Sequence, residues 1–168
     1  MKSDPRAGLG QLPTYLTIMN KPEKEIYHVL VADDSTDDRF LLQSAMKRVS
    51  RLRIVAEVAD GSEVIAYLKG HGPYADRERY PMPDLLLLDL KMPQMDGFEV
   101  LEWMQSESFS GPTVVVLTDS MQAEHIKRAL DLGADLFQVK PRGNPDRETM
   151  VLALEEFLAG SVKARAAN

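Results

Sequence analysis

The chain has 168 residues, of which 44% are hydrophobic and 27% charged, as is typical of one globular domain. Its 20 Lys and Arg and 26 Asp and Glu give a net charge of -6, the wrong sign for binding nucleic acid or an anionic membrane directly. It has no cysteine, so disulfides, thiolate metal sites and cysteine nucleophiles are excluded. No apolar run approaches the ~18 residues of a membrane span and no secretory signal is recognisable, so we expect a cytoplasmic protein.

The chain divides into one folded unit and two end segments. Residues 1–27 hold three prolines and no sustained period, which predicts an N-terminal extension. The main domain is expected to span residues 28–160, with Gly160 ending its last helix. Residues 161–168 are rich in small side chains and predict a frayed C-terminal tail.

Within the main domain, short apolar runs alternate with stretches of helical periodicity. The unbroken apolar character of the runs indicates burial on both faces, as in a parallel sheet covered by helices. The fold class is therefore α/β, a doubly wound (βα)5 arrangement with a parallel five-stranded sheet. The expected strands are Val29–Ala32, Ile54–Ala59, Leu85–Leu88, Thr113–Leu117 and Leu136–Val139.

Apolar residues at helical spacing predict five helices between and after these strands. Gly133 is expected to close the fourth helix in a left-handed conformation, and Asn144 to cap the fifth, with Pro145 at its first position. The apolar positions, in chain order, are Phe40, Leu41, Ala45 and Val49; Val64 and Leu68; Val100, Leu101 and Met104; Ile126 and Leu130; and Val151, Leu154 and Leu158.

Polar residues stand at the carboxyl ends of four predicted strands. Asp33 and Asp34 follow the first strand, Asp89 the third, Thr118 the fourth and Lys140 the fifth. Each alone has an ordinary structural explanation, such as a helix cap or a solvated side chain. Because ligands of doubly wound sheets bind beyond the carboxyl ends of the strands, their agreement predicts one site.

Three carboxylates that converge on one crevice repel each other and must be protonated, paired or bound to a cation. Hard oxygen ligands favour Mg²⁺ or Mn²⁺ over zinc. Three aspartates, one divalent cation and Lys140 sum to zero charge. Such a site could hold and transfer a phosphoryl group, and an aspartate can itself be the covalent acceptor.

These residues resemble the motifs of response-regulator receiver domains of two-component signalling. The resemblance covers residues 28–160. It rests on Asp33-Asp34, on Asp89 within Leu88-Asp89-Leu90-Lys91-Met92-Pro93-Gln94-Met95-Asp96-Gly97, on Thr118, and on Lys140-Pro141. It implies a flavodoxin-like strand order, 2-1-3-4-5.

The resemblance implies that Asp89 accepts a phosphoryl group from a histidine kinase or a phosphotransfer protein. Asp34, Asp89 and the backbone carbonyl of Lys91 would ligate Mg²⁺, and Asp33 would act mainly through a water. Thr118 and Lys140 would bind phosphoryl oxygens. The Lys140-Pro141 bond resembles the family's cis peptide, and Phe137 occupies its aromatic switch position.

Phosphorylation that draws in Thr118 would favour an inward Phe137 and change the face formed by the fourth helix, the fifth strand and the fifth helix. We expect this face to bind a downstream protein or a second copy of the chain, with help from Tyr15, Leu16 and Ile18. No output domain follows the receiver, which predicts a stand-alone, non-enzymatic regulator.

Two features depart from the general pattern. Asp119 replaces the small residue that usually follows Thr118, and it either modulates the site or starts the fourth helix together with Ser120. The segment 70–83 is long for a connection in this fold. It resembles the extended loop of receivers that serve bacterial phytochrome kinases.

Three other functions are compatible with parts of the pattern. A magnesium-dependent phosphatase of the haloacid-dehalogenase type also places carboxylates on a parallel sheet, but its acid pair is spaced, whereas Asp33 and Asp34 are adjacent. A receiver-like scaffold that is never phosphorylated is compatible with Asp119. A flavodoxin is disfavoured, because the acidic loop would repel a flavin phosphate.

Overall fold

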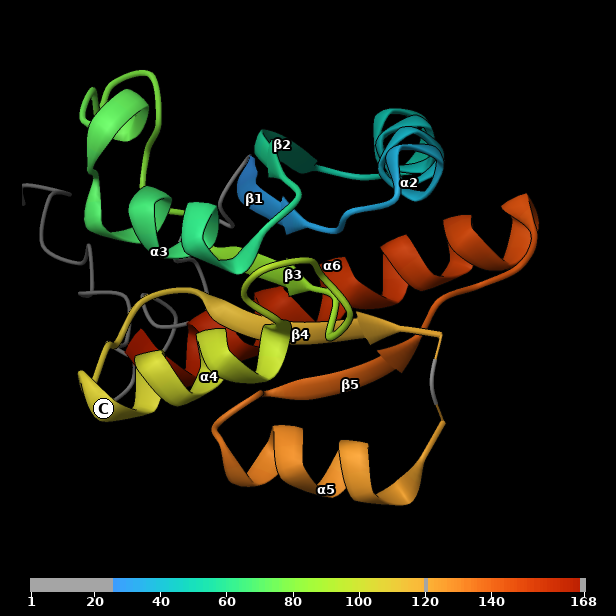
Figure 1. Ribbon diagram of the computed structural model, residues 1–168. Coiled ribbons are helices and arrows are strands. Elements are labelled where there is room, and N and C mark those ends of the chain that lie inside the picture. Colours follow the sequence, from blue (N-terminus) through green and yellow to red (C-terminus); the bar gives the residue numbers. More distant parts are fainter. Residues whose placement is uncertain (1–25, 120, 167–168) are drawn as a thin grey trace, which may run out of the picture.

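The computed structural model describes residues 26–119 and 121–166. They contain one parallel five-stranded sheet of order β2-β1-β3-β4-β5 (Figure 1), which confirms the predicted fold class and strand order. Most of the predicted extension, residues 1–25, lies outside the described residues, whereas Tyr27 already belongs to a strand. The strands are β1 (Tyr27–Ala32), β2 (Leu52–Val58), β3 (Leu85–Leu88), β4 (Thr113–Thr118) and β5 (Leu136–Val139).

Helices cover both faces of the sheet (Figure 1). Two of them, α2 and α6, pack on one face, and α3, α4 and α5 pack on the other. Their bounds are α2 (Thr36–Val49), α3 (Gly61–Lys69), α4 (Gly97–Ser106), α5 (Ala123–Asp131) and α6 (Asn144–Ala166), with a short 3-10 helix, η1 (Gly72–Tyr74), after α3.

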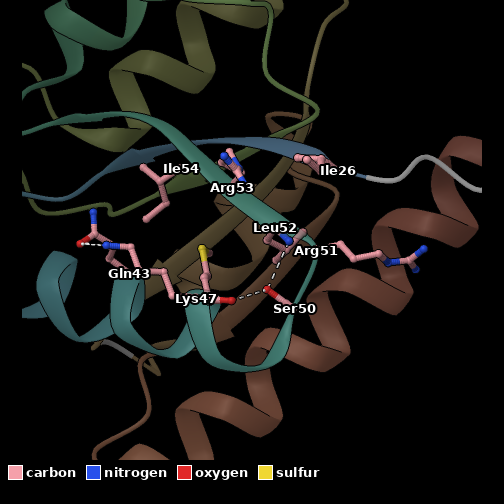
Figure 2. A pocket seen from close by; sticks show the side chains of 9 residues that line it. Ile26, Gln43, Lys47, Ser50, Arg51, Leu52, Arg53 and Ile54 are labelled. Atoms are coloured by element: carbon pink, nitrogen blue, oxygen red, sulfur yellow. Dashed lines mark hydrogen bonds between the residues drawn. The ribbon is translucent and has the colours of Figure 1, made fainter.

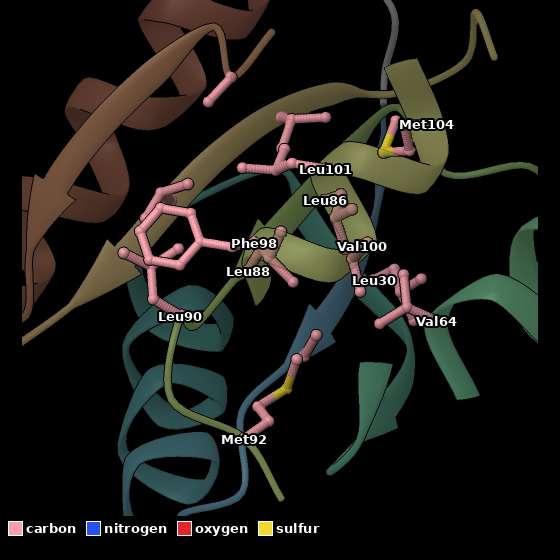
Figure 3. Close-up of a cluster of buried hydrophobic side chains, with 14 of the residues drawn as sticks. Leu30, Val64, Leu86, Leu88, Leu90, Met92, Phe98, Val100, Leu101 and Met104 are labelled. Carbon is pink, nitrogen blue, oxygen red and sulfur yellow. The ribbon is translucent and has the colours of Figure 1, made fainter. Parts of the chain in front are cut away.

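Alternating strand residues contribute to two separate hydrophobic clusters, one on each face of the sheet. In β3, Leu86 and Leu88 face α3 and α4 (Figure 3), while Leu85 and Leu87 face α2 and α6. All four leucines are buried. Successive side chains of a strand point to opposite faces, so a sheet with helices on both sides requires this continuous apolar run. The acidic residues that follow the strands are thereby fixed at one edge.

The predicted apolar face of α2 is wrong in part: Ala45 and Val49 do pack in the cluster on this face of the sheet, but Phe40 does not. Phe40 is 65% exposed, and the residues that pack on the sheet are Leu42, Ala45 and Met46. Apolar residues occur on more than one side of this helix, and spacing alone could not decide which side meets the sheet. Leu130 in α5 is also exposed, whereas Ala129 is buried.

The last helix and its entry differ from the prediction at three points. The helix α6 continues through Gly160 to Ala166, so Gly160 does not end it. It begins at Asn144 itself, whose side chain accepts a hydrogen bond from Arg147 Nη1 at 3.2 Å. No peptide bond in the described residues is cis, so Lys140-Pro141 is trans. The trans form before proline is ordinarily favoured slightly, and Lys140 reaches the acids from it.

The long connection 70–83 is anchored by aromatic side chains. The ring centroid of Tyr74 lies 5.1 Å from that of Tyr67 and 5.3 Å from that of Tyr80, and the centroids of Tyr67 and Tyr80 are 6.1 Å apart. The Tyr67 hydroxyl donates to the Pro81 carbonyl at 2.8 Å, and burial raises the pKa of Tyr67 to about 12. Arg77 Nη2 donates to the Leu68 carbonyl at 2.7 Å. The connection therefore packs against α3.

None of the helices in the described residues has the length and apolar character needed to cross a membrane.

Candidate phosphoacceptor and metal site

The carboxyl ends of β1 and β3 bring three predicted acids together. One carboxylate oxygen from each of Asp33, Asp34 and Asp89 lies within 4.8 Å of the other two. Asp33 and Asp89 are buried, whereas Asp34 is exposed. The cluster therefore opens to solvent on the side of Asp34.

Asp33 is held where β1 passes into α2. Its backbone N–H donates to the Val58 carbonyl at 3.0 Å, and its Oδ1 accepts from the Ser35 N–H at 2.9 Å. Ser35 is the N-cap of α2, and its hydroxyl accepts from the Asp38 N–H. The turn that starts the helix thus also aims the Asp33 carboxylate.

Asp89 is fixed by backbone contacts on both sides. Its N–H donates to the Ala32 carbonyl at 2.8 Å, and its Oδ1 accepts from the Lys91 N–H at 3.1 Å. A Cβ at Gly97 would lie 2.3 Å from the Asp89 carbonyl oxygen, so only glycine permits this approach of α4. Asp96 begins α4 with a capping box to Glu99, as expected for the Asp96-Gly97 helix start.

Lys140 reaches into the cluster from the end of β5. Its Nζ lies 2.8 Å from Asp33 Oδ2 and 2.7 Å from Asp89 Oδ2. Its backbone N–H donates to the Thr118 carbonyl at 2.9 Å, which places the ends of β4 and β5 side by side. The structure thus brings Lys140 against two of the three predicted acids.

Burial and ion pairing shift the pKa values of Asp33 and Lys140 in opposite directions. Burial raises the pKa of Asp33, although the Lys140 ammonium and the Ser35 N–H work in the other direction. For Lys140, burial alone would lower the pKa, but the hydrogen bonds that its ammonium donates to Asp33 and Asp89 outweigh this effect and hold the pKa above the ordinary lysine value. Lys140 is therefore charged at every physiological pH.

Sequence reasoning missed Asp38. Its Oδ2 lies 3.1 Å from Lys140 Nζ, although the residue belongs to the first turn of α2 and its side chain is 34% exposed. Acids in the first turn of a helix are common because they favour the helix dipole, so position alone gave no signal. Only the contact with Lys140 in the folded chain brings Asp38 to the site.

Thr118, Phe137 and Lys91 are the remaining residues predicted for the site. Thr118 is buried at the end of β4, and Phe137 is half-buried in β5, where it pairs in register with Val116. Lys91 is exposed in the turn after Asp89.

Asp119 does not cap a helix. The helix α5 begins at Ala123 with Gln122 at its N-cap position, three residues after Asp119. The carboxylate of Asp119 is exposed directly beyond Thr118 and is not among the three clustered acids. Of the two alternatives for Asp119, the start of this helix is wrong because α5 begins only at Ala123. Ser120, the other residue expected at that start, lies outside the described residues.

A separate hollow of about 610 Å³ lies between α2, β2 and Ile26 (Figure 2). It is lined in part by Lys47, Arg51 and Arg53. Lys47 is bound to Gln43 at 3.0 Å, and Arg51 to Glu155 of α6 at 2.6 Å. The hollow contains none of the predicted site residues.

Residues 29–153 match the family model described as response regulator receiver domain. Response regulator Rcp1 of Synechocystis sp. is 33% identical over 140 residues, which are 83% of this chain and 93% of that protein. A protein-glutamate methylesterase/protein-glutamine glutaminase of Methanospirillum hungatei is 38% identical over 117 residues. That match covers 68% of this chain but 31% of the methylesterase, so the chain spans about a third of that relative.

Solved structures agree with these matches. The phosphorylated cyanobacterial phytochrome response regulator RcpA superposes with a TM-score of 0.70 at 31% identity, covering 81% of this chain and 96% of RcpA. The Mn²⁺-bound form of Rcp1 gives a TM-score of 0.64 at 30% identity, covering 78% of this chain and 93% of Rcp1.

Proposed function

The chain belongs to the response regulator receiver domain family and acts in phosphoacceptor signalling, and we propose that Asp89 is the residue that accepts the phosphoryl group. The observation that carries this assignment is the 2.7 Å contact between Asp89 Oδ2 and Lys140 Nζ beside Asp33 and Asp34. Among these acids, Asp89 alone follows the central strand β3. Nothing supports the haloacid-dehalogenase alternative.

In the proposed reaction, an Asp89 carboxylate oxygen attacks phosphorus. An O–P bond forms, the bond from phosphorus to the donor's imidazole nitrogen breaks, and that nitrogen keeps the electron pair and takes up a proton. Lys140 neutralises charge on one phosphoryl oxygen, and the Thr118 hydroxyl donates to another. The product is an acyl phosphate on the protein itself, so the chain is a phosphoacceptor and not an enzyme that turns over a separate substrate.

The donor set fits a divalent cation. Asp33, Asp34 and Asp89 offer hard carboxylate oxygens within 4.8 Å, as Mg²⁺ and Mn²⁺ prefer, and the Lys91 carbonyl is a further candidate ligand. Such a cation would neutralise charge on the phosphoryl oxygens. We assign Mg²⁺ to the site, with Mn²⁺ as a substitute, as the Mn²⁺-bound form of Rcp1 suggests.

The partner would be a sensor histidine kinase, of the phytochrome type by analogy with RcpA, or a phosphotransfer protein in the cytoplasm. The proposed switch couples Thr118 to Phe137 and to the face formed by α5, β5 and α6. On that face Leu130 is 46% exposed, an apolar contact available to a downstream protein or a second copy of the chain. Light scattering in both phosphorylation states tests the homodimer.

Intact-mass analysis after incubation with Mg²⁺ and acetyl phosphate tests the assignment. We expect one adduct of phosphoryl mass in the native chain and none in Asp89→Asn. Asp37→Asn is the matched control, because Asp37 is exposed and outside the cluster. Borohydride trapping followed by peptide mapping locates the adduct. Label on Asp33 or Asp34 would overturn the assignment, and a chain that never takes the label would be the binding scaffold.

A further inference from the structure

The Lys140 ammonium is fully occupied by carboxylates. An ammonium has three N–H donors, and three oxygens surround this one: Asp33 Oδ2 at 2.8 Å, Asp38 Oδ2 at 3.1 Å and Asp89 Oδ2 at 2.7 Å. The side chain of Lys140 is 8% exposed. Any change in the partners of Asp33 or Asp89 must therefore be matched by a change at Lys140.

A divalent cation at these acids would compete with Lys140 for the carboxylates of Asp33 and Asp89. The Oδ1 atoms of Asp33 and Asp89 already accept the N–H groups of Ser35 and Lys91. Their Oδ2 atoms face the ammonium of Lys140. A cation that coordinates these Oδ2 atoms would repel the ammonium. It would also leave fewer lone pairs on these oxygens to accept hydrogen bonds from the ammonium.

Asp38 offers the ammonium a partner outside this competition. It is not one of the three acids within 4.8 Å of one another, and it projects from α2, with its backbone N–H fixed by Ser35 Oγ at 3.2 Å. The space beside Lys140 that is lined by Asp33, Asp38 and Pro141 is about 10 Å³. That is room for about one water at most, so on this side Asp38 is the nearest available partner for the ammonium.

We propose that Asp38 is a positioning residue that holds the Lys140 ammonium at the site when the carboxylates of Asp33 and Asp89 coordinate the cation. This inference rests on the proposed function in that it assumes a divalent cation at these acids. By retaining the lysine, Asp38 lowers the cost of releasing the shared oxygens and so strengthens cation binding.

Binding of Mn²⁺, followed by electron paramagnetic resonance of the free ion, tests the inference without phosphorylation. We expect Asp38→Asn to weaken Mn²⁺ binding about five- to tenfold, the effect of one partly exposed charge-assisted hydrogen bond. Asp37→Asn is the matched control, because it removes the same charge from the same helical turn. It should change the Kd less than about twofold. Asp38→Glu, which keeps the carboxylate, should recover part of the affinity.

A double-mutant cycle with Lys140→Met separates an effect through the lysine from direct attraction of the cation. Removing the competing ammonium should strengthen Mn²⁺ binding. In that background Asp38→Asn should weaken binding no more than Asp37→Asn. An effect of Asp38→Asn that persists without Lys140, or that equals the control with Lys140 present, would overturn the inference.

The two proposals fail in different ways. If Asp89 takes no phosphoryl group but the Mn²⁺ cycle behaves as expected, the assignment of the acceptor is wrong and the role of Asp38 stands. If Asp89 is labelled but the cycle shows no coupling, only the role of Asp38 is wrong. Circular dichroism of each variant confirms that the chain is folded.

Discussion

Five charged side chains define the electrostatics of the site. Asp33, Asp34, Asp38 and Asp89 with Lys140 sum to -3, and a divalent cation brings the sum to -1, not to the zero expected from three acids. The extra negative charge is that of Asp38. Because an incoming phosphoryl group is anionic, a site with residual negative charge depends on the cation and the lysine to accept it.

Asp119 is a further acid, next in the chain after the predicted site residue Thr118. It is exposed, directly after Thr118, and helix α5 starts without it. We expect Asp119→Ala to react with acetyl phosphate roughly two- to fivefold faster at low ionic strength, because an exposed like charge is modest in effect and screened by salt. The rate of adduct formation, measured by intact mass at two salt concentrations, checks this.

Glu107→Ala is the control for Asp119→Ala. Glu107 is also exposed, but it follows α4 at the opposite end of the sheet. Its loss should leave the rate unchanged. A rate advantage of Asp119→Ala that is equally large at high salt would contradict an electrostatic origin, and a loss of thermal stability would revive the structural role that the position of α5 argues against.

At the scale of the elements, α6 contains a glycine that was expected to end it. Gly160 lies within the helix, and a Cβ there would meet no atom within 4 Å. We expect Gly160→Ala to raise the free energy of unfolding by about 0.5–1 kcal/mol, because alanine loses less backbone entropy in a helix. Urea unfolding with an unchanged slope measures it.

Gly133 provides the contrasting variant. It follows α5 with φ of 98°, a left-handed conformation that alanine adopts only with strain. Gly133→Ala should therefore destabilise the chain, although a Cβ there also meets no atom within 4 Å. Equal effects of the two substitutions would show that local backbone conformation does not decide the outcome.

The strands were predictable, and the helix faces less so. The runs Leu85–Leu88 and Leu136–Val139 form strands with the predicted bounds. For Leu85–Leu88 the reason is burial on both faces, which leaves a continuous apolar signal. In α2, Phe40 is apolar but exposed, and the hydrophobic pattern did not single out one side. Which side of a helix meets the sheet depends on the packing of distant elements.

For the molecule as a whole, parallel topology explains why so much of the site could be predicted. All five strands run the same way, so the residues after β1, β3 and β5 must meet at one edge. This rule found Asp33, Asp34, Asp89 and Lys140. It could not find Asp38, which reaches Lys140 from a helix, over 102 positions of sequence.

A bound cation should stabilise the entire fold and not only its own loops. The clustered acids come from the ends of β1 and β3, and Lys140 ties them to β5, so relief of their repulsion acts on the native state as a unit. Mg²⁺ at ~100 times its Kd should add about 2.7 kcal/mol to the free energy of unfolding. For a chain of this size that corresponds to roughly 5–11 °C in Tm.

Differential scanning calorimetry with increasing MgCl₂, then with excess EDTA, measures this shift. Chelation should return the Tm to its starting value. Asp34→Asn should reduce the shift, because it removes the exposed ligand without touching the buried pair with Lys140. An equal shift in that variant, or the same shift with NaCl of matched ionic strength, would indicate general screening and would place the stabilising cation elsewhere.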